Sequence, residues 1–301
     1  MSVRFDPTGP YEVDETDTPF ARPAGAELLA RIYRPRMEAD CPLGAVVYVH
    51  GGAWARLDRT ADAILCGALA ASGLVVVAVD FRQAPDHRYP VASADIAAGV
   101  RYARAHAGRL HVDPGRVGLL GSSSGALLAL LHAVGPGAPE HTGTPIVRPD
   151  GSLDPTASDA SVAFVVALYP VADPLARYRY ALSREDESPS PSGFDAKRLV
   201  ASHRAFFADE HAMAAASVTR IVSAGQATAL PPVWVGQPDQ DDNVPAAITE
   251  AFVTAYRGAG GSVEHAHFPG ARHSFVQQAS PDTDKCVALV RDFVGRQLGR
   301  S

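Results

Sequence analysis

The sequence predicts an α/β fold in which helices cover both faces of a mostly parallel central sheet. Apolar runs rich in β-branched residues occur at 43–50, 74–81 and 162–169, as expected of strands buried on both faces. Stretches with helical spacing separate these runs, and such alternation is typical of parallel sheets. The chain has 301 residues, of which 47% are apolar, so one sizeable domain with a buried core accounts for its length.

Residues 1–26 are polar and contain several prolines, and we expect them to form an arm or a partial lid. Residues 27–34 are expected to form a strand near an edge of the sheet. Further strands are expected from Val117, at 231–236 and at 263–268, and helices at 60–72, 92–107, 126–132, 244–258 and 282–298.

Two segments interrupt the alternation. Residues 135–161 are rich in Gly, Pro, Ser and Thr and are expected to form a long loop, a feature that is often functional in compact enzymes. Residues 173–229 are polar, with amphipathic helices expected around 195–207 and 210–217. We interpret 173–229 as a helical cap inserted into a single domain that spans residues 1–301.

The motif G-x-S-x-G occurs where the strand from Val117 meets the helix at 126–132. It reads Gly121-Ser122-Ser123-Ser124-Gly125. In a nucleophile elbow the central serine occupies a strained turn that presents its hydroxyl, and flanking glycines allow strand and helix to approach closely. A Ser- and Gly-rich loop that caps a helix would show the same letters. The motif indicates a catalytic serine only if the chain also supplies a base, an acid and an oxyanion hole.

A candidate oxyanion hole follows the strand at 43–50. The segment His50-Gly51-Gly52-Ala53-Trp54 contains two glycines that allow backbone N–H groups to point into a site. The N–H of Ser124, the residue after the candidate nucleophile, would be a further donor. An ordinary Gly-Gly turn after a strand is the alternative interpretation.

Candidate acid and base residues follow the last two predicted strands. Asp239, Asp241 and Asp242 lie just past 231–236, where ligands bind at the carboxyl ends of parallel strands. Only one of these aspartates can orient a histidine. His273 follows 263–268 and could act as the general base, although it is one of 11 histidines. The order Ser, Asp, His is the one found in α/β-hydrolases.

These motifs together resemble the hormone-sensitive-lipase-like branch of the α/β-hydrolase family, a group of carboxylesterases and acetyl esterases. The stretches 80–90 (DFRQAPDHRYP) and 113–123 (DPGRVGLLGSS) are similar to family segments. Pro231-Pro232 and the Gly270 to Phe275 pattern, G-x-x-H-x-F, also match. The resemblance covers about residues 27–298. It implies an α/β-hydrolase fold with an inserted helical cap.

The resemblance also assigns roles to residues. It implies Ser123 as nucleophile and His273 as base, with Gly51, Gly52, Ala53 and Ser124 forming the oxyanion hole. The family spacing from the Pro-Pro pair favours Asp241 as the acid, with Asp239 as second choice. No cofactor or metal is implied.

Two positions depart from the family pattern. The usual segment H-G-G-G has Ala53 in place of its third glycine, and alanine keeps its N–H. The usual elbow G-D-S-A-G has Ser122 in place of its acidic residue, which leaves the local support of the elbow open. The form H-G-G-x-W also resembles esterases near kynurenine formamidase.

We therefore expect a serine hydrolase that cleaves short-chain acyl esters, a small-molecule substrate, through an acyl-enzyme. An amidase of the formamidase kind with the same triad is one alternative. A non-catalytic small-molecule binding protein on this fold is another. The resemblance also allows a homodimer.

The charge and cysteine content indicate which cellular location and which binding partners to expect. A net charge of −6 without long single-sign blocks argues against nucleic-acid and anionic-membrane partners. The 3 cysteines are widely spaced, as expected of thiols in a reducing compartment. No signal peptide or membrane span is expected, so we expect a cytoplasmic protein.

Overall fold

The computed structural model describes residues 5–37, 40–155, 159–190 and 193–299. Its strands are β1 Val13–Ala21, β2 Leu28–Pro35, β3 Leu43–Val49, β4 Leu74–Val79, β5 Val112–Ser122, β6 Ile146–Val147, β7 Leu153–Asp154, β8 Val165–Leu168, β9 Val233–Pro238 and β10 Val263–Phe268. Its α-helices are α1 Ala63–Ala71, α2 Val91–Ala105, α3 Ala107–Leu110, α4 Ser124–Val134, α5 Pro174–Leu182, α6 Ala196–Phe206, α7 Glu210–Ala215, α8 Val218–Ser223, α9 Ala246–Gly258 and α10 Pro281–Leu298. Two short 3₁₀ helices, η1 Pro139–His141 and η2 Phe275–Gln277, complete the described elements.

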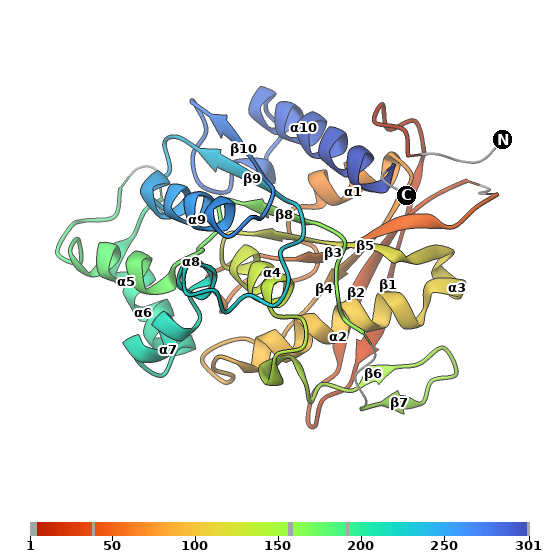
Figure 1. Ribbon diagram of the computed structural model, residues 1–301, viewed down its shortest axis with the longest axis horizontal. Coiled ribbons are helices and arrows are strands. Elements are labelled where there is room, and N and C mark those ends of the chain that lie inside the picture. Colours follow the sequence, from red (N-terminus) through yellow and green to blue (C-terminus); the bar gives the residue numbers. More distant parts are fainter. Residues whose placement is uncertain (1–4, 38–39, 156–158, 191–192, 300–301) are drawn as a thin grey trace.

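The ten described strands form one sheet in the order β10-β9-β8-β5-β3-β4-β2-β1-β6-β7. The six strands from β10 to β4 pair in parallel, and β2, β1, β6 and β7 continue the sheet with antiparallel pairing. Figure 1 shows the helices on both sides of this sheet. The predicted α/β fold with a mostly parallel sheet is confirmed.

Neighbouring residues of the central strands belong to two separate cores because side chains alternate between the faces of a sheet. On β3, Val47 packs into the core beneath α2, α4 and α9, whereas Val46 packs into the core beneath α1 and α10. Val77 and Val76 of β4 divide in the same way. Burial on both faces explains why these strands are continuous apolar runs.

The N-terminal segment differs from the expectation of an arm or lid. Residues 13–21 of the predicted arm 1–26 form β1, which pairs antiparallel with β2, while residues 1–4 lie outside the described residues. The strand was missed because only Phe20 and Ala21 at its end are buried. Its acidic side chains instead pair across the strands, as in the 2.8 Å contact between Arg31 Nε and Asp17 Oδ1.

The segment predicted as one long loop, 135–161, also contains regular structure. It forms η1 and the short hairpin of β6 and β7, and Ile146 of β6 pairs with Ala21 of β1. Residues 156–158 of this segment lie outside the described residues. The segment therefore extends the antiparallel edge of the sheet, away from the carboxyl ends of the parallel strands (Figure 1).

The insertion predicted at 173–229 contains four helices, α5 to α8, between β8 and β9. Side chains of Asp173, Asp195, Asp209 and Ser217 accept N–H groups in the first turn of α5, α6, α7 and α8. Such capping satisfies N–H groups that lack partners within the helix, which explains where the helices begin. Helices α6 and α7 match the predicted pair, α5 and α8 were not predicted, and residues 191–192 are outside the described part.

Cys66 and Cys286 are free thiols that fill space in the core beneath α1 and α10. Within the described ranges, no helix is long and apolar enough to cross a membrane.

Buried histidines predict that the free energy of unfolding decreases at acidic pH. Burial lowers the pKa of His132 on α4 to about 3, against an ordinary value of 6.5. Between these values the unfolded chain binds a proton that the folded protein does not. His132 therefore stabilises the fold above pH 6.5, and this contribution is lost as the pH falls, by at most about 1.4 kcal/mol per pH unit.

We expect His132→Gln to flatten the pH dependence of the unfolding free energy between pH 4 and 6, measured by urea denaturation. The glutamine amide can still donate to the Ala160 carbonyl, which His132 Nε2 contacts at 2.7 Å. His211→Gln, at an exposed position, is the control. An unchanged slope in His132→Gln would contradict the assignment.

Candidate active site

Ser123 occupies a sharp turn between β5 and α4. Its φ of 52° and ψ of −118° lie in a region that non-glycine residues rarely adopt. The two glycines of the motif allow this turn. A Cβ on Gly121 would lie 2.7 Å from Ala126 Cα, and one on Gly125 would lie 2.2 Å from the His50 carbonyl oxygen. The turn therefore has the close packing that the motif predicts for a nucleophile elbow.

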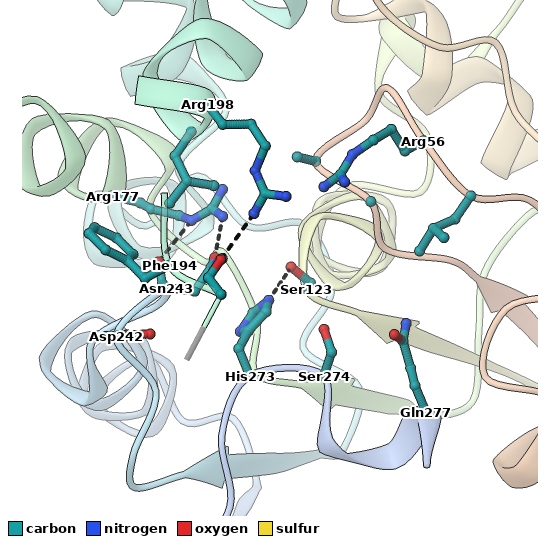
Figure 2. Close-up of a pocket in the computed structure, with 15 residues that line it drawn as sticks. Arg56, Ser123, Arg177, Phe194, Arg198, Asp242, Asn243, His273, Ser274 and Gln277 are labelled. Carbon is teal, nitrogen blue, oxygen red and sulfur yellow. Dashed lines mark hydrogen bonds between the residues drawn. The ribbon is translucent and has the colours of Figure 1, made fainter. Parts of the chain in front are cut away.

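A chain of hydrogen bonds joins Ser123, His273 and Asp241 (Figure 2 shows the first). The Ser123 hydroxyl lies 2.9 Å from His273 Nε2, and His273 Nδ1 lies 2.7 Å from Asp241 Oδ2. The Asp241 side chain is 1% exposed and that of His273 15%. Because the carboxylate can only accept, the neutral ring carries its proton on Nδ1. Nε2 is then free to accept the Ser123 proton.

Two neighbouring parallel strands bring Asp241 and His273 together. β9 and β10 pair in register, so the loops that follow them leave the same edge of the sheet. The loops are also bonded to each other, with the Gln240 N–H donating to the Ala271 carbonyl at 3.0 Å. Asp239 lies elsewhere in this loop, and its Oδ1 is 2.7 Å from Nδ1 of His267. The structure thus places Asp241, and not Asp239, beside His273.

The Asp241 carboxylate is held by its own loop. Its Oδ1 accepts the N–H groups of Asn243 at 2.9 Å and Val244 at 2.8 Å. Asn243 is in turn held by Arg177 of α5, which donates to both its backbone and its side-chain oxygen. Sequence reasoning missed Arg177, because nothing in its local pattern separates it from the other arginines of the insertion.

The segment after β3 lies beside the elbow, as the oxyanion prediction requires. Gly52 has a φ of 100°, and a Cβ there would lie 2.0 Å from the Arg56 carbonyl oxygen. Ala53 adopts a φ of 54°, a left-handed conformation that favours glycine. Within the described chain, the N–H groups of Gly52 and Ala53 donate to no protein acceptor. The N–H of Ser124, at the start of α4, is one that the helix leaves unpaired.

Trp54 connects this segment to the elbow and to the insertion. Its indole Nε1 donates to the Ser124 carbonyl at 3.1 Å. Its ring is completely buried and stacks on Phe206 of α6, with centroids 4.8 Å apart. The ring also meets Phe207 edge-on at 5.3 Å. One side chain therefore fixes the positions of three separate chain segments.

A series of buried hydrogen-bonded side chains supports the elbow at Ser122, the position at which the family usually has an acidic residue. The Ser122 hydroxyl lies 3.3 Å from the Tyr48 hydroxyl, which donates to Asp62 Oδ2 at 2.8 Å. Burial raises the pKa of Tyr48 well above its ordinary value, so its hydroxyl keeps its proton. Asp62 thus supplies, through Tyr48, a carboxylate behind the elbow that position 122 lacks.

A pocket of about 250 Å³ opens onto Ser123 and His273. Figure 2 shows it bordered by the segment after β3 on one side and by residues of the insertion on the other. Gly52 and Ala53 line it, as do Phe194, Arg198 and Leu199 from the insertion. Among the described residues, no group of three or more His, Cys, Asp or Glu side chains could hold a metal ion.

The packing of Trp54 predicts a large stability cost for its removal. We expect Trp54→Ala to lower the unfolding free energy by about 3–5 kcal/mol, because it leaves a cavity between the elbow and α6. Trp54→Phe keeps an aromatic ring and loses the hydrogen bond, so its cost should be about 1–2 kcal/mol. Urea denaturation measures both values. Equal losses in the two variants would show that the ring packing contributes little.

Comparison with known proteins places these features in a family. Esterase LipC of Mycobacterium tuberculosis (strain ATCC 25618 / H37Rv) is 27% identical over 257 residues, which cover 82% of this chain and 57% of LipC. Ethyl acetate hydrolase of Pseudomonas putida is 27% identical over 286 residues, 91% of this chain and 80% of that protein. The crystal structure of EstE1, a thermostable carboxylesterase from a metagenomic library, superposes with a TM-score of 0.75 at 22% identity. It covers 96% of this chain and 90% of EstE1.

The chain spans 57% of the length of LipC. The family model described as alpha/beta hydrolase fold matches residues 46–277, which run from β3 through the elbow and the insertion to η2. This range contains all the proposed site residues and confirms the resemblance seen in the sequence. The chain belongs to the alpha/beta hydrolase fold family.

Proposed function

We propose that the protein is a serine hydrolase of carboxylic esters. The observation that carries the proposal is the hydrogen-bonded series from Ser123 through His273 to Asp241, in which a hydroxyl, a base and a carboxylate lie in reacting order. The esterase names of relatives such as LipC and ethyl acetate hydrolase support the choice of esters.

In the proposed reaction His273 Nε2 removes the Ser123 proton as the hydroxyl oxygen attacks the ester carbonyl carbon. The resulting imidazolium is stabilised by the Asp241 carboxylate, which also holds the ring in position. His273 then returns the proton to the departing alcohol oxygen, and an acyl-enzyme remains on Ser123. Water attacks this ester with the same base, which releases the acid and restores Ser123.

The negative charge that develops on the carbonyl oxygen requires preorganised donors. The N–H groups of Gly52, Ala53 and Ser124 are the proposed donors, and Gly51 shapes the segment that carries two of them. A Cβ at Gly51 would lie 3.2 Å from the Ser122 carbonyl oxygen, which shows how closely this segment approaches the elbow. Trp54 holds the segment in place through the Ser124 carbonyl.

The small pocket supports a short acyl group. Its volume of about 250 Å³ is below the range of roughly 300–1,000 Å³ usual for drug-sized ligands. The name of the relative ethyl acetate hydrolase is consistent with this size.

We expect p-nitrophenyl esters, tested from acetate to palmitate, to be hydrolysed best between acetate and butyrate. Ser123→Ala should lower kcat on the best ester by on the order of 10⁴- to 10⁶-fold, because it removes the nucleophile. A fluorophosphonate should label the native protein and not this variant. Unchanged turnover in Ser123→Ala would contradict the proposal, and a maximum at long chains would contradict the short-acyl assignment.

Formamide substrates, measured beside these esters, separate esterase from formamidase activity. A protein that is labelled by the fluorophosphonate and cleaves formamides faster than esters would be an amidase. Folded protein that neither labels nor cleaves either class would indicate a binding protein on this fold.

The two aspartates of the acid loop provide a matched comparison. Asp241→Asn should lower kcat by about 10⁴-fold, because the amide does not hold His273 in the required tautomer. Asp239→Asn should change kcat by less than about threefold, because Asp239 contacts the half-exposed His267 instead. Steady-state kinetics at constant pH measure both. The reverse order would identify Asp239 as the acid.

A further inference from the structure

Three arginines line the pocket around Ser123. Arg56 comes from the segment after β3, Arg177 from α5 and Arg198 from α6, so they converge from three separate parts of the chain. Figure 2 shows the guanidinium groups of Arg56 and Arg198 extending into the space beside the Ser123 hydroxyl. Arg177 also holds Asn243 in the Asp241 loop, but the proposed hydrolysis of a neutral ester requires neither the charge of Arg56 nor that of Arg198.

Within the described residues, none of the three arginines has a carboxylate at ion-pair distance. Arginines nearby do have one: Arg59 contacts Asp80 at 2.9 Å, and Arg82 contacts Asp95 at 2.7 Å. Asp242, whose carboxylate accepts the Ser190 hydroxyl at 3.2 Å, also lines the pocket and contributes one negative charge. The described lining thus has three arginines against one aspartate, so positive charge predominates in the pocket.

Arg177 contributes a buried charge. It is 1% exposed, and its Nη1 is buried without a hydrogen-bond partner. Burial lowers its pKa to about 10, while the charge of Asp241 raises it and that of Arg198 lowers it, so the group remains protonated at neutral pH. A buried cation is unfavourable, and the nearby Asp241 carboxylate offsets part of that cost. Arg177 therefore adds to the positive charge at the pocket, although Asp241 offsets part of its charge.

Arg56 and Arg198 can contact such an occupant directly. Both side chains are exposed at the pocket, and each guanidinium can donate two parallel hydrogen bonds to a carboxylate. Burial first, and then the like charge of Arg198, lower the pKa of Arg56. The two groups are therefore near enough to repel each other, and an anion between them would relieve that repulsion.

We propose that the preferred substrate is an ester that also carries a free carboxylate, which binds between Arg56 and Arg198 while the ester carbonyl lies at Ser123. This inference rests on the proposed function and specifies its substrate class. The carboxylate can belong to the acyl part, as in a hemiester of a short dicarboxylic acid. It can also belong to the alcohol part, as in an O-acetylated hydroxy acid. A pocket volume of about 250 Å³ favours a small molecule of either kind.

The test compares charged esters with neutral counterparts of nearly the same shape. Monomethyl succinate against dimethyl succinate tests a carboxylate on the acyl side, and O-acetyl lactate against its methyl ester tests the alcohol side. We expect one charged member to have a kcat/KM about tenfold above that of its neutral partner, measured by pH-stat. Added NaCl should reduce this preference, because salt screens the attraction.

Substitutions of the pocket arginines test whether these residues cause the preference for charged esters. Arg56→Gln and Arg198→Gln should each reduce the ratio of charged to neutral kcat/KM by about fivefold, as expected for partly exposed ion pairs. Lys197→Gln is the matched control, because it removes the same charge from α6 at an exposed position outside the pocket lining. Its ratio should equal that of the native protein.

Binding of succinate, measured by calorimetry, tests the arginines without turnover. Succinate should bind the native protein and the Lys197→Gln variant, and binding should be lost in the Arg56→Gln/Arg198→Gln double variant. If neutral esters are cleaved as fast as charged ones and succinate does not bind, the inference is wrong and the esterase proposal stands. If succinate binds through the arginines and no ester is cleaved, the anion site stands and the esterase proposal is wrong.

Discussion

Ser123 adopts its positive φ between the last residue of β5 and the first of α4, and the site is assembled around the hydroxyl that this turn presents. The turn exists because Gly121 and Gly125 lack side chains that would collide with α4 and with the end of β3. It presents the Ser123 hydroxyl beyond the sheet edge, within 2.9 Å of His273. It also brings the unpaired N–H groups at the start of α4 to the same point.

The insertion is connected to the site by two buried side chains that act in different ways. Trp54 packs against α6 and bonds to the elbow, so the segment with the candidate oxyanion donors cannot move independently of α6. Arg177 of α5 holds the Asn243 end of the loop that contains Asp241. Pocket shape and the geometry of the hydrogen-bonded series are therefore coupled, because the same helices determine both.

Some site residues could be predicted because their signals are local. Ser123 lies in a five-residue motif, and Gly51 and Gly52 directly follow an unmistakable buried strand. The choice between Asp239 and Asp241 could not be made from the residues alone, since both follow β9 in the same loop. The structure separates them through distance: Asp239 lies beside His267, and Asp241 lies beside His273. Arg56 and Arg198 were missed because arginines at unremarkable positions acquire a role only when distant segments meet.

By itself the sequence determined the α/β class, the central strands and the order of the motifs, because buried strands and glycine turns depend on short-range patterns. Tertiary structure alone decided that residues 13–21 join the sheet, since their pairing with β2 depends on cross-strand contacts rather than on an apolar pattern. It also placed Asp241, which the family spacing had favoured over Asp239, beside His273, and it alone decided which arginines surround Ser123. Those features depend on distances between residues far apart in the chain, and such distances arise only when the strands pair and the insertion packs over their carboxyl ends.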